Sequence, residues 1–271
     1  MNVTDIELAL RDKKGFIFDI DGTVALGTQP LGEARAFFEL LRRHGRRTLI
    51  YTNNPNRSHR EAADYLRAMG YDVAPDDVVS TSDVAVEYIK EHHPNARVFV
   101  LGVPSWVEHL KEQGLSVVDA DADEADVVLI GYDKTLTWEK AAMACRMIAK
   151  GATFLATHSD PCVPTDVGML PDCGSMCAMI ETASGVAPKY LGKPWTLGLP
   201  LIEHVTGMKP RELCMVGDRL NTDIAFANRA GMTSLLVLTG ATTAEQAASA
   251  TGMEAPDFTV PDLSVLMDMF N

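Results

Sequence analysis

Short apolar runs rich in β-branched residues alternate along almost the whole chain with longer segments whose apolar residues recur at helical spacing. The short runs predict strands at Gly15–Ile20, Arg47–Tyr51, Arg97–Leu101, Val127–Ile130, Thr153–Ala156, Leu213–Val216 and Ser234–Leu238. The longer segments predict helices at Glu33–Arg43, Asp83–Glu91, Trp106–Gln113, Ser175–Ser184, Thr196–Val205, Thr222–Arg229 and Leu263–Met269. Strands that alternate with helices are typical of an α/β protein with a doubly wound, mainly parallel sheet.

Local signals mark the ends of two more helices. Ser58 and Glu61 have the spacing of a capping box, and Gly70 follows where such a helix would stop. Thr137 is expected to cap a helix over Trp138–Ala149.

Four apolar runs end at a polar residue that could carry chemistry. These residues are Asp19, Thr52, Lys193 and Asp218. Ligands of open α/β sheets bind outside the carboxyl ends of the strands, so we expect the four side chains to converge on one crevice.

Asp19 and Asp21 are two residues apart at a predicted strand end, which places both carboxylates on one side of the sheet. Two like charges this close raise each other's pKa unless a cation lies between them. Mg²⁺ is a hard cation that prefers oxygen ligands and therefore suits such a site, and Asp218 can supply a further ligand. A solvated turn is the alternative interpretation of an isolated Asp pair.

Two other segments have the character of anion sites or helix caps. Thr52, Asn53 and Asn54 follow a strand and precede a helix, so they could face an anion or simply form a turn. Asp218 and Asp223 bracket a loop at another strand end, and capping explains Asp223 but not Asp218.

Composition narrows the possible partners. The chain has 271 residues, 46% apolar and 23% charged, with a formal net charge of −13. These values indicate a soluble globular protein with room for a second module, and the charge argues against nucleic-acid or anionic-membrane surfaces. An anionic substrate would have to be attracted locally, by a metal, a lysine or helix N-termini.

The sequence also predicts a cytoplasmic protein. It shows no signal-peptide pattern at the N-terminus and no apolar run near the roughly 20 residues that a bilayer crossing needs. The five cysteines are odd in number and lack paired CxxC spacing, which favours reduced, buried thiols; Cys173 and Cys177 could share a helix face.

The chain resembles phosphatases of the haloacid dehalogenase (HAD) superfamily in four ordered motifs. They are DIDGT from Asp19, TNN from Thr52, GKP around Lys193 and GDRLNTD from Gly217, in the form used by the NagD-like branch, subfamily IIA. That branch includes sugar-phosphate, phosphoglycolate, pyridoxal-phosphate and nitrophenyl-phosphate hydrolases. The similarity extends over nearly the whole chain.

The resemblance implies a role for each motif residue. Asp19 would be the nucleophile that forms an aspartyl-phosphate, and Asp21 the general acid/base. The phosphate would be held by Thr52, Asn53, Asn54 and Lys193. Mg²⁺ would be bound by the Asp19 carboxylate, the Asp21 backbone carbonyl and Asp218, with Asp223 behind them fixing water or Lys193. The substrate would be a small phosphorylated metabolite.

The spacing of the motifs predicts an inserted domain. The stretch from Thr52 to Lys193 is far longer than one strand and helix, and it contains strand and helix signals of its own. We therefore expect a Rossmann-like core from residues 1–80 and 185–271 and a smaller α/β cap at 81–184, which is where the NagD-like branch carries its cap.

Within the cap, Thr157–Pro171 lacks helix or strand period and carries His158, Asp160 and Asp166. It is the candidate specificity loop for the leaving group, with Asp133 as a second candidate. An ordinary surface loop is the alternative.

Two other functions fit parts of the pattern. A phosphotransferase or phosphomutase would use the same aspartyl-phosphate, although the cap position favours hydrolases. A non-catalytic metabolite-binding module would not need Asp19, Asp21, Lys193 and Asp218 together, and no GxGxxG follows the first strand. Neither the substrate nor the oligomeric state can be read from the sequence, although caps of this branch often contribute to homodimers.

Overall fold

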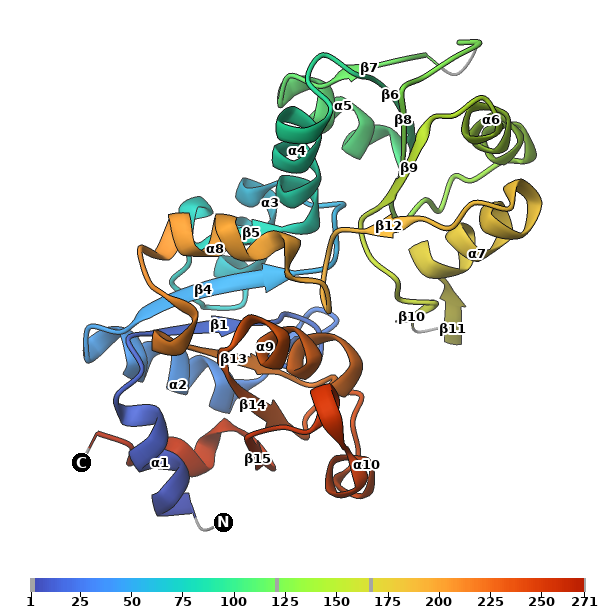
Figure 1. Cartoon of the computed structure of the whole chain (residues 1–271). Helices are drawn as coiled ribbons and strands as arrows, with labels where there is room; N and C mark the ends of the chain where they lie inside the picture. The colour runs from blue at the N-terminus through green and yellow to red at the C-terminus, as the bar shows by residue number, and fades with distance from the viewer. Residues whose placement is uncertain (1–2, 120–121, 166–167, 271) are drawn as a thin grey trace. The chain divides into compact units, whose positions relative to one another are not determined.

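The computed structural model describes residues 3–119, 122–165 and 168–270 (Figure 1). Its internal contacts divide the chain into two compact units. The first unit comprises Met1–Thr52, His59–Val79 and Lys193–Asn271, and the second comprises Asn53–Ser58 and Ser80–Gly192.

The first unit is built on a six-stranded sheet with β13 and β1 at its centre (Figure 1). In spatial order the strands are β15 (Phe258–Val260), β14 (Thr233–Val237), β13 (Leu213–Gly217), β1 (Gly15–Phe18), β4 (Arg47–Thr52) and β5 (Val78–Ser80). The pairings from β15 across to β4 are all parallel. Every residue of β1 and β13 is buried, as expected for central strands of a sheet covered on both faces.

Helices pack on both faces because successive side chains of a strand point in opposite directions. Phe16 and Phe18 of β1 lie against Phe37 and Phe38 of α2, with ring centroids 6.0 and 5.4 Å apart. On the other face, Tyr51 of β4 packs against the Phe226 ring of α9 at 5.2 Å. The α-helices of this unit are α1 (Val3–Arg11), α2 (Gly32–Arg43), α3 (His59–Ala68), α8 (Leu199–Thr206), α9 (Ala225–Ala230) and α10 (Ala244–Ser249).

Short elements complete the first unit. A small antiparallel hairpin joins β2 (Ala25–Leu26) to β3 (Gln29–Pro30), and Leu220–Ile224 forms a π-helical turn, η4, ahead of α9. Single 3₁₀ turns lie at η1 (Pro75–Asp77), η2 (Thr196–Gly198), η3 (Pro210–Glu212), η5 (Gly252–Glu254) and η6 (Leu263–Leu266).

The second unit has its own parallel sheet. In spatial order the strands are β12 (Lys189–Tyr190), β9 (Thr153–Ala156), β8 (Val127–Ile130), β6 (Arg97–Leu101) and β7 (Ser116–Val117). The helices are α4 (Thr81–His92), α5 (Pro104–Glu112), α6 (Trp138–Ala149) and α7 (Cys173–Ser184), and an antiparallel hairpin joins β10 (Cys162–Thr165) to β11 (Gly168–Pro171). Residues 185–192, which the sequence analysis assigned to the core, group with this unit because β12 pairs with β9.

The α/β class and all the predicted strands are confirmed. Thr137 caps α6 by accepting a hydrogen bond from the Lys140 backbone N–H, and Cys173 and Cys177 share one face of α7 with their sulfur atoms 3.9 Å apart. Within the part of the chain that the structure describes, no helix combines the length and apolar character of a membrane span.

The prediction that Thr157–Pro171 contains no strand was wrong, because β10 and β11 lie within it. Pro164, Gly168 and Pro171 hide the strand pattern in this segment, and proline is tolerated in the edge strands of a hairpin. The helix expected at Leu263–Met269 is only the short turn η6.

One tryptophan of the second unit is buried at the ends of two of its strands. Trp106 of α5 is buried, and its ring occupies the space where side chains at Gly102 and Gly131 would lie: an added Cβ would approach it to 2.3 and 2.6 Å. The indole N–H donates to the hydroxyl of Ser82 at 2.9 Å. Glycines at the ends of β6 and β8 thus make room for the ring, and Ser82 satisfies its single polar atom.

We expect Ser82→Ala to destabilise the second unit by about 1–3 kcal/mol, because it leaves the buried indole N–H without an acceptor. The measurement is the urea midpoint followed by tryptophan fluorescence. Ser116→Ala, at an exposed position of β7, is the control and should stay within about 0.5 kcal/mol of wild type. Equal midpoints for both variants would contradict this account of Trp106.

Candidate active site

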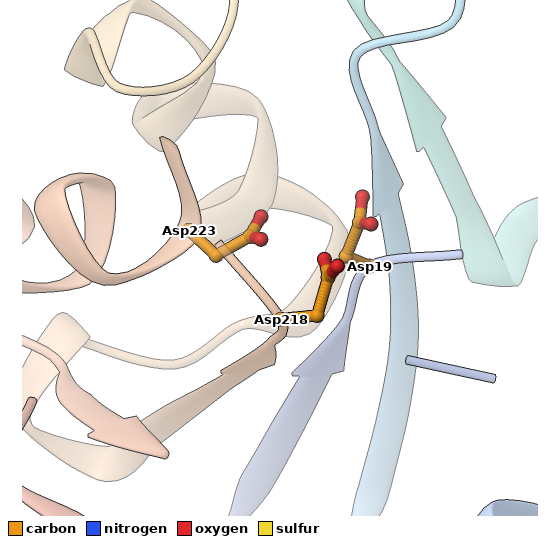
Figure 2. A group of neighbouring side chains, drawn as sticks. All are labelled: Asp19, Asp218 and Asp223. Carbon is orange, nitrogen blue, oxygen red and sulfur yellow. The ribbon is translucent and has the colours of Figure 1, made fainter. Parts of the chain in front are cut away.

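Three carboxylates gather at the carboxyl ends of β1 and β13. Asp19 follows β1 directly and Asp218 follows β13, while Asp223 lies in the turn η4. Because β1 and β13 are parallel neighbours, with Phe18 opposite Val216, their first residues beyond the sheet emerge side by side. One oxygen from each of the three carboxylates lies within 4.8 Å of the others (Figure 2).

Lys193 connects this cluster to β4. Its ammonium donates to Asp19 Oδ1 at 2.6 Å, to Asp223 Oδ1 at 2.7 Å and to the carbonyl oxygen of Tyr51 at 3.0 Å. The side chain is only 2% exposed. An ammonium carries three hydrogens, so these three acceptors use all of its donor capacity.

Lys193 was predicted to follow a strand of the sheet that carries Asp19, and this prediction was wrong. The strand before it, β12, pairs with β9 in the sheet of the second unit. Lys193 reaches the carboxylates as the first residue of the chain segment that returns to the first unit. A short strand followed by a polar residue does not reveal to which of two sheets the strand belongs.

Close packing holds the carboxylates in place. The Asp223 side chain lies against Gly217, where an added Cβ would come within 2.2 Å of it, and its Oδ2 accepts from the Arg219 N–H at 3.2 Å. Asp218 Oδ2 accepts from the Ala241 N–H at 2.6 Å. Its other oxygen, Oδ1, is buried and has no hydrogen-bond partner among the described residues.

The turn after Asp19 needs a glycine. Gly22 has a φ of +87°, which side-chain-bearing residues rarely adopt, and a Cβ there would lie 2.4 Å from Asp218 Oδ2. Thr239 donates to the Gly22 carbonyl at 2.6 Å and so secures the turn. Asp21 lies in this turn with an exposed side chain.

The charges in the cluster do not balance. Burial raises the pKa of Asp19 to about 8; Lys193 opposes the shift, while Asp223 and Asp218 add to it. Burial and Asp223 raise the pKa of Asp218 to about 6. Burial alone would lower the pKa of Lys193, but Asp19 and Asp223 outweigh it and raise that pKa. Three carboxylates share one ammonium, so a further cation would stabilise their ionised forms.

The donor set fits a hard divalent cation. Asp19 and Asp218 supply carboxylate oxygens, and Asp218 Oδ1 is a buried acceptor that no described hydrogen bond satisfies. Both oxygens of Asp223 already accept hydrogen bonds, from Lys193 and from Arg219. This arrangement suits a residue that orients Lys193 better than one that binds a metal directly.

The predicted phosphate-binding residues fall in both units. Thr52 is the last residue of β4 and is buried, whereas Asn53 and Asn54 begin the second unit. Asn54 Oδ1 accepts from the Asn56 N–H at 3.0 Å, which forms a tight local turn. The Asn53 side chain donates to Asp160 Oδ2 at 3.2 Å.

The predicted specificity residues have partners inside the second unit. His158 is buried, with Nδ1 2.9 Å from the Thr157 hydroxyl and Nε2 3.1 Å from Asp172 Oδ1. Burial would lower the pKa of His158, but Cys173 and Asp172 raise it to about 9.

Asp133 and Asp160 are buried as well. Asp133 forms an ion pair with Lys140 at 2.8 Å and accepts from the Thr135 backbone. Asp166 lies outside the described residues. His158 and Asp160 therefore do not lie on an ordinary surface loop, the alternative interpretation of this segment. The roles of His158, Asp160 and Asp133 in substrate specificity stay predictions.

Several contributors could not be found by motif. The Tyr51 carbonyl that holds Lys193 is a backbone group, and Asp172, the partner of His158, has the sequence position of a helix cap. Gly217 precedes Asp218, but the close approach of the Asp223 side chain appears only in three dimensions.

Known proteins are similar to this chain over most of its length. A family model described as haloacid dehalogenase-like hydrolase matches residues 16–116, and a second, HAD-hydrolase-like model matches residues 190–266. A 5′-nucleotidase of Bacillus subtilis is 33% identical over 94% of this chain and 98% of its own length.

Two solved structures are similar over most of the chain. One is a 4-nitrophenylphosphatase of Thermotoga maritima, with a TM-score of 0.89, 36% identity and coverage of 96% of this chain and 98% of that one. The other is a glycerol phosphate phosphatase of Mycobacterium tuberculosis in complex with magnesium, with a TM-score of 0.87, 34% identity and coverage of 95% and 77%.

The raised pKa values predict how Mg²⁺ should stabilise the protein. Unfolded Asp titrates near 3.8, whereas Asp218 and Asp19 in the folded protein titrate near 6 and 8. Between these values the folded protein holds more protons, so the stability of the metal-free protein falls as the pH rises. A bound cation would offset this loss.

We therefore expect Mg²⁺ to raise the melting temperature more at about pH 8 than at about pH 6. Differential scanning fluorimetry with and without Mg²⁺ measures both shifts. Asp218→Asn should lose most of the Mg²⁺ effect at both pH values. A Mg²⁺ shift that is the same at both pH values, or that survives in Asp218→Asn, would contradict the site.

Proposed function

Since the chain belongs to the haloacid dehalogenase superfamily, as a phosphatase of the NagD-like branch, we propose that it hydrolyses phosphomonoesters of small metabolites through an aspartyl-phosphate, with Mg²⁺ as cofactor. The observation that carries the proposal is the buried Lys193 ammonium, which holds Asp19 and Asp223 beside Asp218. Phosphoryl transfer depends mainly on positioning and on neutralising oxygen charge, and this cluster supplies both.

Asp19 is the nucleophile in this proposal. Its carboxylate attacks phosphorus in line, a P–O bond forms to Asp19, and the bond to the leaving oxygen breaks. The hydrogen bond from Lys193 fixes the attacking carboxylate, and the same ammonium offsets the negative charge of the phosphate oxygens.

Asp21 is the general acid and base. In the first step it donates a proton to the leaving oxygen, and in the second it takes a proton from the water that hydrolyses the aspartyl-phosphate. Its exposed side chain, two residues beyond Asp19, supports a role in exchanging protons with substrate and water.

The remaining motif residues bind the phosphate and the cation. Thr52, Asn53 and Asn54 hold phosphate oxygens, and Lys193, whose three hydrogens already have acceptors, attracts these oxygens by its charge. The Asp19 and Asp218 carboxylates and the Asp21 carbonyl would hold Mg²⁺, which would supply positive charge to polarise the phosphoryl group. The buried Asp218 Oδ1 supports this ligand set. The magnesium complex of the similar mycobacterial phosphatase supports the choice of cation. Asp223 orients Lys193.

The names of similar proteins support the substrate class. A nucleotidase, a nitrophenylphosphatase and a glycerol phosphate phosphatase all act on phosphomonoesters that differ in the leaving group. We therefore propose hydrolysis of a sugar phosphate, phosphoglycolate, nucleotide or pyridoxal phosphate, with nitrophenyl phosphate as an artificial substrate. The cytoplasmic location and the homodimer stay predictions from the sequence.

Asp19→Asn should abolish phosphate release from nitrophenyl phosphate, because an amide cannot form the aspartyl-phosphate and removes a charge from the cation site. The check is a phosphate-release assay with Mg²⁺, using Asp12→Asn, at an exposed position before β1, as the matched control. Activity of Asp19→Asn within tenfold of that control would overturn the assignment of the nucleophile.

Asp21→Asn should lower kcat by about 10²–10⁴-fold, with a larger loss for glycerol phosphate than for nitrophenyl phosphate. An alkoxide needs a proton to leave, whereas nitrophenolate is a good leaving group without one. Steady-state kinetics with both substrates give the two losses. Equal losses would argue against the acid role of Asp21.

A further inference from the structure

Asn53 is tied to the second unit by two hydrogen bonds. It is the first residue of that unit and follows Thr52 directly. Its carbonyl oxygen accepts from the Thr81 hydroxyl at 2.7 Å, and its side-chain nitrogen donates to Asp160 Oδ2 at 3.2 Å. Asp160 lies 107 residues later in the chain, so this contact is tertiary.

The opposite side of the Asn53 amide meets Gly192, the last residue of the same unit. A Cβ at Gly192 would lie 2.6 Å from Asn53 Oδ1, 2.5 Å from Thr81 Cγ2 and 2.6 Å from the Thr157 carbonyl oxygen. The Asn53 side chain is therefore bounded on two sides, with its nitrogen toward Asp160 and its oxygen toward Gly192. A carboxylate only accepts hydrogen bonds, so Asp160 fixes which way the amide is turned.

Asp160 is itself held in place by contacts within the second unit. It is 8% exposed, and its backbone carbonyl accepts from the Gly174 N–H at 2.9 Å, at the start of α7. Gly174 packs closely there: a Cβ on it would come within 2.3 Å of the Ser159 carbonyl oxygen. The backbone of Asp160, which carries the carboxylate that meets Asn53, is thus held by the first turn of a helix.

We propose that Asp160 is a positioning residue that acts through Asn53, holding the Thr52-Asn53-Asn54 turn in the geometry that binds phosphate. The inference rests on the proposed phosphatase function. It replaces the sequence-based interpretation in which Asp160 reads the leaving group. A residue that orients the phosphate-binding turn affects every phosphomonoester equally, because the phosphate is the part that all substrates share.

The test compares Asp160→Ala, which removes the acceptor, with Asp160→Asn, which keeps the shape and one acceptor oxygen. For Asp160→Ala we expect KM for nitrophenyl phosphate, KM for glycerol phosphate and the inhibition constant of inorganic phosphate to rise by a common factor of about tenfold or more. Asp160→Asn should recover most of the loss. Asp123→Ala, at an exposed position of the same unit, is the control.

A double-mutant cycle with Asn53→Ala separates positioning from a general structural effect. If Asp160 acts through Asn53, adding Asp160→Ala to Asn53→Ala should change KM less than twofold. Independent, multiplicative losses would overturn the proposal, and so would a loss confined to glycerol phosphate with unchanged inhibition by inorganic phosphate. Should Asp160→Ala fail to fold, the same comparison is made with Asp160→Leu, which has a similar branched shape and no acceptor, alone and in the Asn53→Ala background.

Failure of the proposed function would look different. In that case the unmodified protein with Mg²⁺ would release no phosphate from either ester, whatever residue stands at position 160. Active wild-type protein combined with an unchanged Asp160→Ala variant would overturn the positioning role alone.

Discussion

A buried ammonium organises this molecule. Lys193 lies almost out of contact with water, where an unpaired charge would be very costly, and it is stable there only because Asp19, Asp223 and the Tyr51 carbonyl accept its three hydrogens. Those acceptors come from the ends of β1 and β4 and from the turn η4. One side chain therefore fixes the relative positions of three segments, and the same charge is the one that a phosphoryl-transfer reaction needs.

Three carboxylates, each able to carry one negative charge, surround the single positive charge of Lys193. Asp218 contributes a buried oxygen without a described hydrogen bond, and the pKa values of Asp19 and Asp218 are raised. Folding thus gathers carboxylate oxygens that a divalent cation would bind, and the cation would in turn attract a phosphate. Glycines at positions 22 and 217 permit this density, because a side chain at either position would collide with a carboxylate.

The sequence predicted the parts of the site that depend on local pattern. Asp19 and Asp218 follow apolar strands that are central and parallel, so their positions could be inferred from strand ends alone. Lys193 was identified by motif, but the sequence did not show that the strand before it belongs to the sheet of the second unit. His158 and Asp160 were predicted to lie in an irregular specificity loop, but the sequence did not reveal their tertiary partners, Asp172 and Asn53. Such partners leave no periodic signal in the sequence.

Three of the points where the chain passes between the first and the second unit lie close together. Asn53, Thr81 and Gly192, which stand at or beside three of its junctions with the first unit, lie against one another. An inserted domain whose ends meet makes little demand on its host, because its interior can change while its attachment stays the same. Substitutions elsewhere in the interior of the second unit can thus change the leaving-group preference, while the junction residues, Asp160 and the strand ends that perform the chemistry stay the same.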